Sequence, residues 1–362
     1  MSLLSARAVN RATLARQLLL ERADLTPAEA VGRLAGMQGQ EPKHPYAGLW
    51  TRLAGFAATD LTHAVHEREV VRATFFRGTL HLVTKADYLA FRGTLTPVLE
   101  AGLKLLGDRA AGLDQAAVVA AARKLLAAGP LTFTEIRDAL IEQFPEVNDR
   151  ALGFTTRMLV PLVMVPTDTR WAYPANARFT LAEDWLGKAP TPDVVPKDLV
   201  ERYLRAFGPA TPTDFQTWSG LTKAKALFDA SELERFKDES GKILYDLPDA
   251  PRPGEHVDAP VRFLPEFDNL LLAHAKRERI IADEHRPAVF TKNLRIKATF
   301  LVDGRVAGLW TADKKRGVAT LTLTPFGKPG KRSESELERE GTALLEFLEP
   351  EAKSLQVVTE QR

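Results

Sequence analysis

The 362-residue chain contains no cysteine. This absence excludes disulfide bonds, zinc sites built on thiolates and cysteine nucleophiles. Of the seven histidines, only His63 and His66 lie close together, and no HExxH sequence accompanies them, so we expect no metal site. The glycine-rich GxGxxG and GxxxxGK[ST] sequences and the GxSxG of many hydrolases are also missing. We therefore expect no cofactor.

Long hydrophobic runs are missing as well. No apolar stretch reaches the ~18 residues needed to cross a bilayer, and the N-terminal MSLLSAR lacks the basic region and apolar core of a secretion signal. A hydrophobic content of 45% and a charged content of 27% are typical of a globular protein. We expect a cytoplasmic protein without membrane contacts, divided into two or three modules of ~100–200 residues.

Charge is unevenly distributed along the chain. The whole sequence has a net charge of only +2, yet residues 261–332 contain 15 Lys and Arg against 7 Asp and Glu. The rest of the chain is therefore acidic. A polyanion such as nucleic acid is expected to bind the basic C-terminal part.

Three successive stretches show the same predicted order, in which helices precede a β-hairpin. In the first, Thr26-Pro27-Ala28-Glu29 is a helix start, and residues 71–84 read as two strands with a turn at Arg77-Gly78. The further predictions are helices over 5–20, 61–70, 87–106, 114–128, 149–163, 199–207 and 223–228, a helix start at 132–135, a second wing over 165–181, a linker over 189–196 and a hairpin at Ser240-Gly241.

This order is typical of winged helices, although a single copy would fit a generic α+β domain equally well. Tandem copies favour nucleic acid, because helix N-termini and basic wings suit phosphates, whereas some winged helices bind proteins instead. Beyond them, Asp303-Gly304 marks a hairpin, residues 317–324 alternate as a strand, and 334–348 are helical. We predict an α+β fold with three tandem winged-helix modules followed by a small basic β-barrel or curled sheet with a C-terminal helix. The predicted boundaries are 1–90, 91–188, 189–255 and 256–362.

Two carboxamides, Gln38 and Gln40, flank Gly39 in the first module. Pro42 and Pro45 bias the residues before them away from helix. We expect the pair at a helix C-terminus or in a loop, with both side chains on one side. A pair of solvated polar residues is the simpler alternative.

Five stretches can be compared with a known family: AGMQGQEP at 35–42, RGTLHLV at 77–83, FLPEFDNLLLAH at 263–274, FTKNLR at 290–295 and VDGRVAG at 302–308. In these stretches the chain resembles the winged-helix DNA glycosylases of the azinomycin-resistance (AlkZ) type, which unhook interstrand crosslinks. The resemblance implies three winged helices and a β-barrel, and it implies that Gln38 and Gln40 form the catalytic Gln-x-Gln motif. The family's middle residue is typically aliphatic, so we expect Gly39 to loosen the loop.

The implied activity is excision of bulky N7-alkylguanine from double-stranded DNA by hydrolysis of the N-glycosidic bond, in base excision repair or antibiotic self-resistance. N7-alkylation makes guanine a cationic leaving group, so no acid with a raised pKa is needed. Amide oxygens can orient water and stabilise the sugar. Possible supporting residues are Glu41, His44, Arg77 and His81.

A crosslinked base stays tied to the other strand, so we expect an open cleft rather than full base flipping, with residues 292–297 forming a hairpin that approaches a groove. Lysines that protect a sheet edge are the alternative explanation for these cations. The expected DNA-binding residues are Lys292, Asn293, Arg295, Lys297, Lys314, Lys315 and Arg316.

No heptad seam is visible, which favours a monomer that associates with the nucleoid when bound to DNA. The alternative functions are a non-enzymatic winged-helix regulator or resistance protein and a protein-interaction scaffold.

Overall fold

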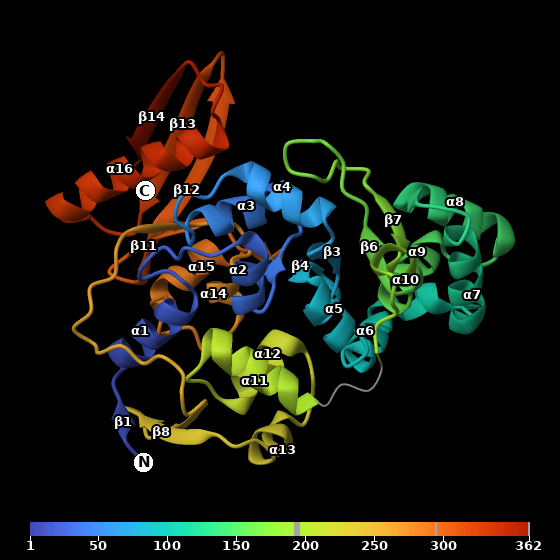
Figure 1. Cartoon of the computed structure of the whole chain (residues 1–362), viewed down its shortest axis with the longest axis horizontal. Coiled ribbons are helices and arrows are strands. Elements are labelled where there is room, and N and C mark those ends of the chain that lie inside the picture. Colours follow the sequence, from blue (N-terminus) through green and yellow to red (C-terminus); the bar gives the residue numbers. More distant parts are fainter. Residues whose placement is uncertain (192–195, 294, 361–362) are drawn as a thin grey trace.

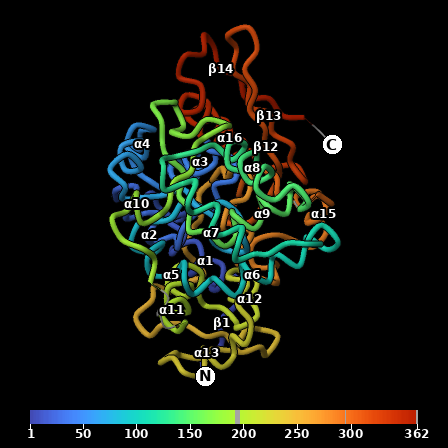
Figure 2. Tube along the Cα trace, turned by 90° about the vertical axis from the view of Figure 1, so that its right-hand side faces the viewer, coloured from blue at the N-terminus to red at the C-terminus, as the bar shows by residue number. Residues whose placement is uncertain are grey.

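The computed structural model describes residues 1–191, 196–293 and 295–360 and contains three β-sheets with helices around them (Figure 1). The predicted α+β class is confirmed. Residues 192–195 of the expected linker and Leu294 of the expected 292–297 hairpin lie outside the described residues. The C-terminal sheet is at one end of the molecule and the N-terminal strand at the other (Figure 2).

The largest sheet joins strands from the first two expected modules. Its order is β2-β4-β3-β6-β7-β5. The predicted hairpin within 71–84 is confirmed as the antiparallel pair β3–β4, whose turn holds Arg77 and Gly78 at positive φ. A bridge from Ala73 to Val163 continues the sheet into β6. The strands are β2 (Met37–Gln38), β3 (Val70–Thr74), β4 (Leu80–Thr84), β5 (Leu131–Thr132), β6 (Leu162–Met164) and β7 (Arg178–Leu181).

Two helices around this sheet, α2 and α8, begin where the sequence predicts capping. Thr26 with Glu29, and Thr132 with Glu135, form reciprocal capping boxes. The helices are α2 (Pro27–Arg33), α3 (Lys43–Trp50), α4 (Ala58–His66), α5 (Lys85–Phe91), α6 (Thr96–Gly102), α7 (Gln115–Leu126), α8 (Phe133–Gln143), α9 (Asp149–Leu159) and α10 (Ala182–Leu186).

Prolines explain three differences from the predicted helices. The single helix expected over 87–106 is broken into α5, α6 and a 3₁₀ segment, because Pro97 is accommodated in the first turn of a new helix. The helix expected over 149–163 ends at Leu159, since Val160 precedes Pro161 and is extended. By contrast, the segment after the glutamine pair is helical: Pro45 lies in the first turn of α3, where its missing N–H removes no hydrogen bond.

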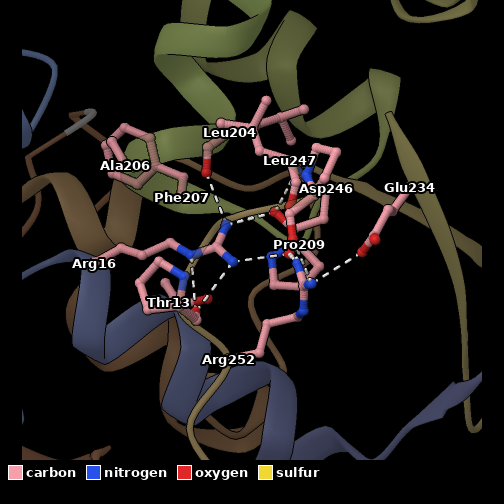
Figure 3. A network of polar contacts seen from close by, with 12 residues as sticks. Thr13, Arg16, Leu204, Ala206, Phe207, Pro209, Glu234, Asp246, Leu247 and Arg252 are labelled. Atoms are coloured by element: carbon pink, nitrogen blue, oxygen red, sulfur yellow. Dashed lines mark hydrogen bonds and ion pairs between the residues drawn. The ribbon is translucent and has the colours of Figure 1, made fainter. Parts of the chain in front are cut away.

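The N-terminus packs against the third stretch. Strand β1 pairs in parallel with β8, and the expected hairpin at Ser240-Gly241 is confirmed as β8–β9. Arg16 of α1 donates to Asp246 Oδ1 of β9 at 2.6 Å and to the Leu204 carbonyl at 2.9 Å (Figure 3). These elements are α1 (Ala6–Arg16), α11 (Pro196–Phe207), α12 (Pro212–Ser219), α13 (Ala224–Asp229), β1 (Leu3–Leu4), β8 (Glu234–Asp238) and β9 (Ile243–Asp246).

The C-terminal sheet has the order β10-β11-β12-β13-β14 and two edge strands, so within the described residues it is an open sheet. The barrel form of the prediction is not confirmed, because the described strands do not close into a ring. The parallel strand β14 pairs only with β13, and β10 pairs only with β11 in this sheet. The Asp303-Gly304 turn is confirmed between β11 and β12. The elements are β10 (Arg262–Leu264), β11 (Thr299–Val302), β12 (Arg305–Lys315), β13 (Val318–Pro325), β14 (Ser354–Thr359), α14 (Asn269–Leu272), α15 (Arg286–Val289) and α16 (Lys331–Leu348).

Aromatic packing fixes this sheet against the first module. Trp50 of α3 stacks on Phe347 of α16, with ring centroids 6.1 Å apart. Ala47 of α3 belongs to the apolar cluster that fills the C-terminal part. The helix that follows the glutamine pair is therefore in contact with the C-terminal sheet.

Candidate active site

The glutamine pair lies on extended backbone and not at a helix end. Helix α2 ends at Arg33, whereas Gln38 is in strand β2 and Gln40 is in the bend before α3. Gln38 is only 8% exposed, while Gln40 is exposed. Across the β2–β4 pair, Gln38 is directly opposite His81. The predicted helix C-terminus is therefore wrong, and the loop alternative holds for Gln40 but not for Gln38, which lies in a strand.

Arg72 of β3 ties down the loop between the two glutamines. Its Nε donates to the Gly39 carbonyl at 2.7 Å and its Nη2 donates to the Gln40 carbonyl at 2.8 Å. The Gly39 N–H donates to the Leu80 carbonyl at 2.9 Å. Burial lowers the pKa of Arg72 from its usual value. Both backbone polar groups of Gly39 are thus bonded, so the structure does not support the loosening expected from glycine.

Asn269, from the C-terminal part, holds the other edge of β2. Its Oδ1 accepts the Gln38 N–H at 3.3 Å, and its Nδ2 donates to the Gly36 carbonyl. The preceding residue, Asp268, forms a buried bidentate ion pair with Arg52, with N–O distances of 2.8 and 2.9 Å. Strand β2 is therefore clamped between β4 and a turn that lies more than 200 residues further along the chain.

A small cavity of about 10 Å³ lies beside Gln38. Its lining includes Gln17, His44, Glu266 and Asn269. Within the described part of the chain, Gln17 Oε1 and His44 Nδ1 are buried without a hydrogen-bond partner. A cavity of this size holds about one water molecule, and such a water would satisfy polar atoms of this kind.

The two histidines near Gln38 are neutral at neutral pH. Burial lowers the pKa of His44 to about 4, with a smaller opposing effect of Glu266. Burial and the charge of Arg77 lower the pKa of His81 to about 3, and its Nδ1 lies 3.0 Å from the Thr79 carbonyl. Neither histidine is therefore a cationic acid in this site.

The remaining suggested supporting residues differ in their surroundings. Arg77 lies in the β3–β4 turn and donates to the Trp218 carbonyl, and burial lowers its pKa to about 10. Glu41 is exposed next to Gln40. Arg77 is thus held by its hydrogen bond to the Trp218 carbonyl, while Glu41 is open to solvent.

The seven expected DNA-binding residues fall into two groups. The first group, Lys292, Asn293, Arg295 and Lys297, lies on or beside a loop closed by the antiparallel bridge from Phe290 to Ile296. Arg295 donates to both carboxylate oxygens of Glu266 at 2.8 Å, which places this loop beside the small cavity.

The second group, Lys314, Lys315 and Arg316, is exposed at the end of β12 and in the turn to β13, toward the outer tip of the C-terminal sheet (Figure 1). Lys314 pairs with Glu349 at 2.7 Å and Lys315 pairs with Asp313 at 2.8 Å. Two of these three cations are therefore already paired with a carboxylate.

Sequence reasoning missed Arg72, Asp268 and Asn269. An arginine among the apolar residues of β3 was one available signal, because buried arginines need partners. Asp268 and Asn269 lie in the stretch 263–274 that carried the family resemblance, but their contact with β2 is not visible from local sequence.

Over residues 1–191, 196–293 and 295–360, no three His, Asp or Glu side chains are grouped as a metal site requires. In the same ranges, no helix is both long and apolar enough to cross a bilayer.

Comparison with known proteins agrees with this architecture. A curated protein of Streptomyces sahachiroi, an interstrand DNA cross-link repair glycosylase, is 27% identical over 338 residues, covering 86% of this chain and 88% of the relative. The structure of Streptomyces sahachiroi DNA glycosylase AlkZ superimposes with a TM-score of 0.81 at 23% identity, covering 100% of both chains. The model of the family described as DNA glycosylase AlkZ-like matches residues 31–347. The chain therefore belongs to the AlkZ-like DNA glycosylase family.

Proposed function

We propose that this glycosylase excises bulky N7-alkylguanine from duplex DNA and unhooks interstrand crosslinks, with Gln38 and Gln40 as its catalytic residues. The observation that carries the proposal is the hydrogen-bonded Gln38-Gly39-Gln40 backbone, whose Gln38 lines a cavity for one water molecule. The name of the Streptomyces sahachiroi relative supports the substrate class.

The reaction breaks the C1′–N9 bond of the alkylated nucleotide. The bonding electron pair moves to the base and cancels its positive charge, while a water oxygen bonds to C1′ and the water loses a proton to solvent. Because the leaving group is already cationic, protonation of the base is unnecessary. The neutral state of His44 and His81 is compatible with this chemistry.

The two glutamines have different environments and, we infer, different roles. Gln38 is buried at the one-water cavity, so its amide holds the attacking water in place. Gln40 is exposed, so its amide oxygen faces the bound sugar and stabilises the positive charge that develops there. Glu41 and His44 have structural or supporting roles.

The repeated strand order supports the assignment of winged helices. In the first module, β2 pairs with β4 and β4 with β3; in the second, β5 pairs with β7 and β7 with β6. In the third, Ala210 bridges to β9, which pairs with β8. We infer three winged-helix modules with boundaries near residues 90, 188 and 255.

Both basic groups are proposed to contact duplex DNA, the 290–297 loop next to the reacting nucleotide and the β12–β13 turn further along the backbone. The protein is proposed to act as a monomer and to associate with the nucleoid through this binding.

The test is incubation with a duplex that carries one N7-alkylguanine, scored as strand breaks after alkali treatment. Wild type should produce abasic sites, and Gln38→Ala and Gln40→Ala should each lower the rate about 100-fold or more. Gln143→Ala, at an exposed glutamine of α8, is the matched control and should leave the rate unchanged. Binding by wild type without strand breaks would instead identify a DNA-binding regulator.

A further inference from the structure

A second cavity, of about 230 Å³, lies between helix α3, the C-terminal sheet and the end of α16. It is lined by side chains from three expected modules, including Trp171 of the second and Trp310 and Leu348 of the C-terminal part. Nothing in the catalytic proposal above uses these residues.

This cavity is next to the small cavity beside Gln38, and the two share part of their lining. His44, Pro265 and Glu266 line both the 230 Å³ cavity and the one-water cavity beside Gln38. His44 is 6% exposed, and its Nδ1 has no hydrogen-bond partner among the residues that the structure describes. A group attached to a base that reacts near Gln38 would therefore lie next to residues that line the larger cavity.

The walls are aromatic and nearly neutral. The Trp310 Nε1–H is already bonded to the Leu264 and Thr299 carbonyls at 2.9 and 3.1 Å, so its indole offers only apolar surface. Trp171 is half-buried and makes an edge contact with Tyr46 at 4.9 Å between ring centroids. The walls favour flat apolar groups.

The charged wall residues are Glu266, Glu349 and the exposed Lys43, and both carboxylates are paired with cations. Glu266 is paired with Arg295 and Glu349 is paired with Lys314. The volume is below the ~300–1,000 Å³ of sites for whole drug-sized ligands, so one ring system fits better than a complete flipped nucleotide with its adduct.

We propose that this aromatic cavity binds the substituent on N7 of the damaged guanine and selects flat, uncharged, apolar substituents. The inference rests on the proposed excision of N7-alkylguanine. It separates two tasks: the glutamines act on the glycosidic bond, which all such lesions share, and the aromatic cavity recognises the part that differs between lesions.

Ala312 offers a way to fill the aromatic cavity from an exposed position. It lines the cavity and is paired with Leu321 on β13. Thr322 is the matched control, because it is the next residue along β13 and its side chain points to the opposite face. Ala312→Trp and Thr322→Trp therefore add the same ring on opposite faces of one strand pair.

The experiment measures single-turnover excision from two duplexes that differ only in one adduct, 7-methylguanine or 7-benzylguanine. Ala312→Trp should slow excision of the benzyl adduct about tenfold and change the methyl rate by less than about twofold. Thr322→Trp should change neither rate. Equal slowing of both adducts by Ala312→Trp, or slowing of neither, would overturn the inference.

Trp171→Ala is a second variant that opens the cavity wall and does not depend on fitting a larger side chain. This variant should also slow excision of the benzyl adduct selectively. The inference would be contradicted if the excision rates of the two adducts changed by the same factor, or if neither changed. If wild type excises neither adduct, the proposed function itself fails, which is distinct from loss of selectivity in a variant that still excises 7-methylguanine.

Discussion

Asn269 should control the rate of excision through the position of strand β2. Asn269→Ala removes two buried hydrogen bonds, one from the Gln38 N–H and one to the Gly36 carbonyl. Each loss costs about 1–1.5 kcal/mol, so the free energy of unfolding should fall by about 2–3 kcal/mol, which most domains tolerate. With that edge of β2 released, Gln38 can shift, and a displacement near 1 Å can lower a catalytic rate about 100-fold.

Asn10 provides a matched control for this prediction. It is also buried, and its Nδ2 donates to the Arg279 and Gly304 carbonyls at 2.8 and 2.9 Å, but it lies on α1 and does not contact β2. Asn10 Oδ1 also accepts from Arg11 Nη1 at 2.6 Å, so Asn10→Ala should destabilise the protein at least as much as Asn269→Ala and leave the rate of excision unchanged.

The assay combines urea unfolding with single-turnover excision of 7-methylguanine. Asn269→Ala should lose about 30- to 100-fold in rate while remaining folded under assay conditions. If both variants lose stability and both keep the wild-type rate, Asn269 has only a structural role and its hydrogen bonds to β2 do not position Gln38.

Four further outcomes are expected. Gly39→Ala should keep the excision rate within about threefold, because its Cβ would lie 3.4 Å from Pro45 Cγ and 3.5 Å from the Leu82 nitrogen in ordinary contact; a larger loss would show that excision needs the freedom of glycine. Asp246→Ala leaves Arg16 buried without its carboxylate, so urea unfolding should show a loss of about 3–5 kcal/mol, against almost none for the exposed Asp229→Ala. The free energy of unfolding should fall as pH drops from about 6.5 toward 4, because unfolded histidines take up protons near 6.5 whereas folded His44 and His81 resist protonation until about 4 and about 3; a flat profile would contradict their burial. Replacing Lys292 and Arg316 together by glutamine should weaken duplex binding and reduce the slope of log K against log salt by about 2, and an unchanged slope would rule out both as phosphate contacts.

Local signals predicted the elements that depend on nearby residues. The capping boxes at Thr26 and Thr132 place their helices correctly, because each cap satisfies N–H groups within three residues. The turns at Arg77-Gly78 and Asp303-Gly304 were predicted for the same reason, since their positive φ values are a local requirement.

The failures concern position along a helix and contacts between distant segments. Pro45 is compatible with helix only because it lies in the first turn of α3, and the residue type alone does not reveal that register. Closure of a barrel depends on whether the first and last strands meet, and here β10 and β14 remain opposite edges of the sheet.

The candidate site shows the same contrast between features that local sequence predicts and contacts between distant segments. The Gln-x-Gln spacing and the neighbouring His44 were visible in the sequence. The bonds that hold the pair come from Arg72 on a neighbouring strand and from Asn269 in the C-terminal part, and no local pattern predicts contacts over such separations. The sequence could therefore indicate the proposed catalytic residues, but not what holds them in place.

The arrangement around Asp268 explains how neutral amides could suffice for catalysis. Arg52 donates to both oxygens of Asp268 and also to the Gln17 and Gly48 carbonyls, so one buried guanidinium joins α1, α3 and the turn that carries Asn269. A fixed dipole stabilises developing charge without reorganising. The stabilisation from a mobile amide would be reduced by the free-energy cost of ordering it. The C-terminal part thus supports strand β2 directly: without Asp268 and Asn269, the glutamine strand would keep its sequence but lose one of its two supporting edges.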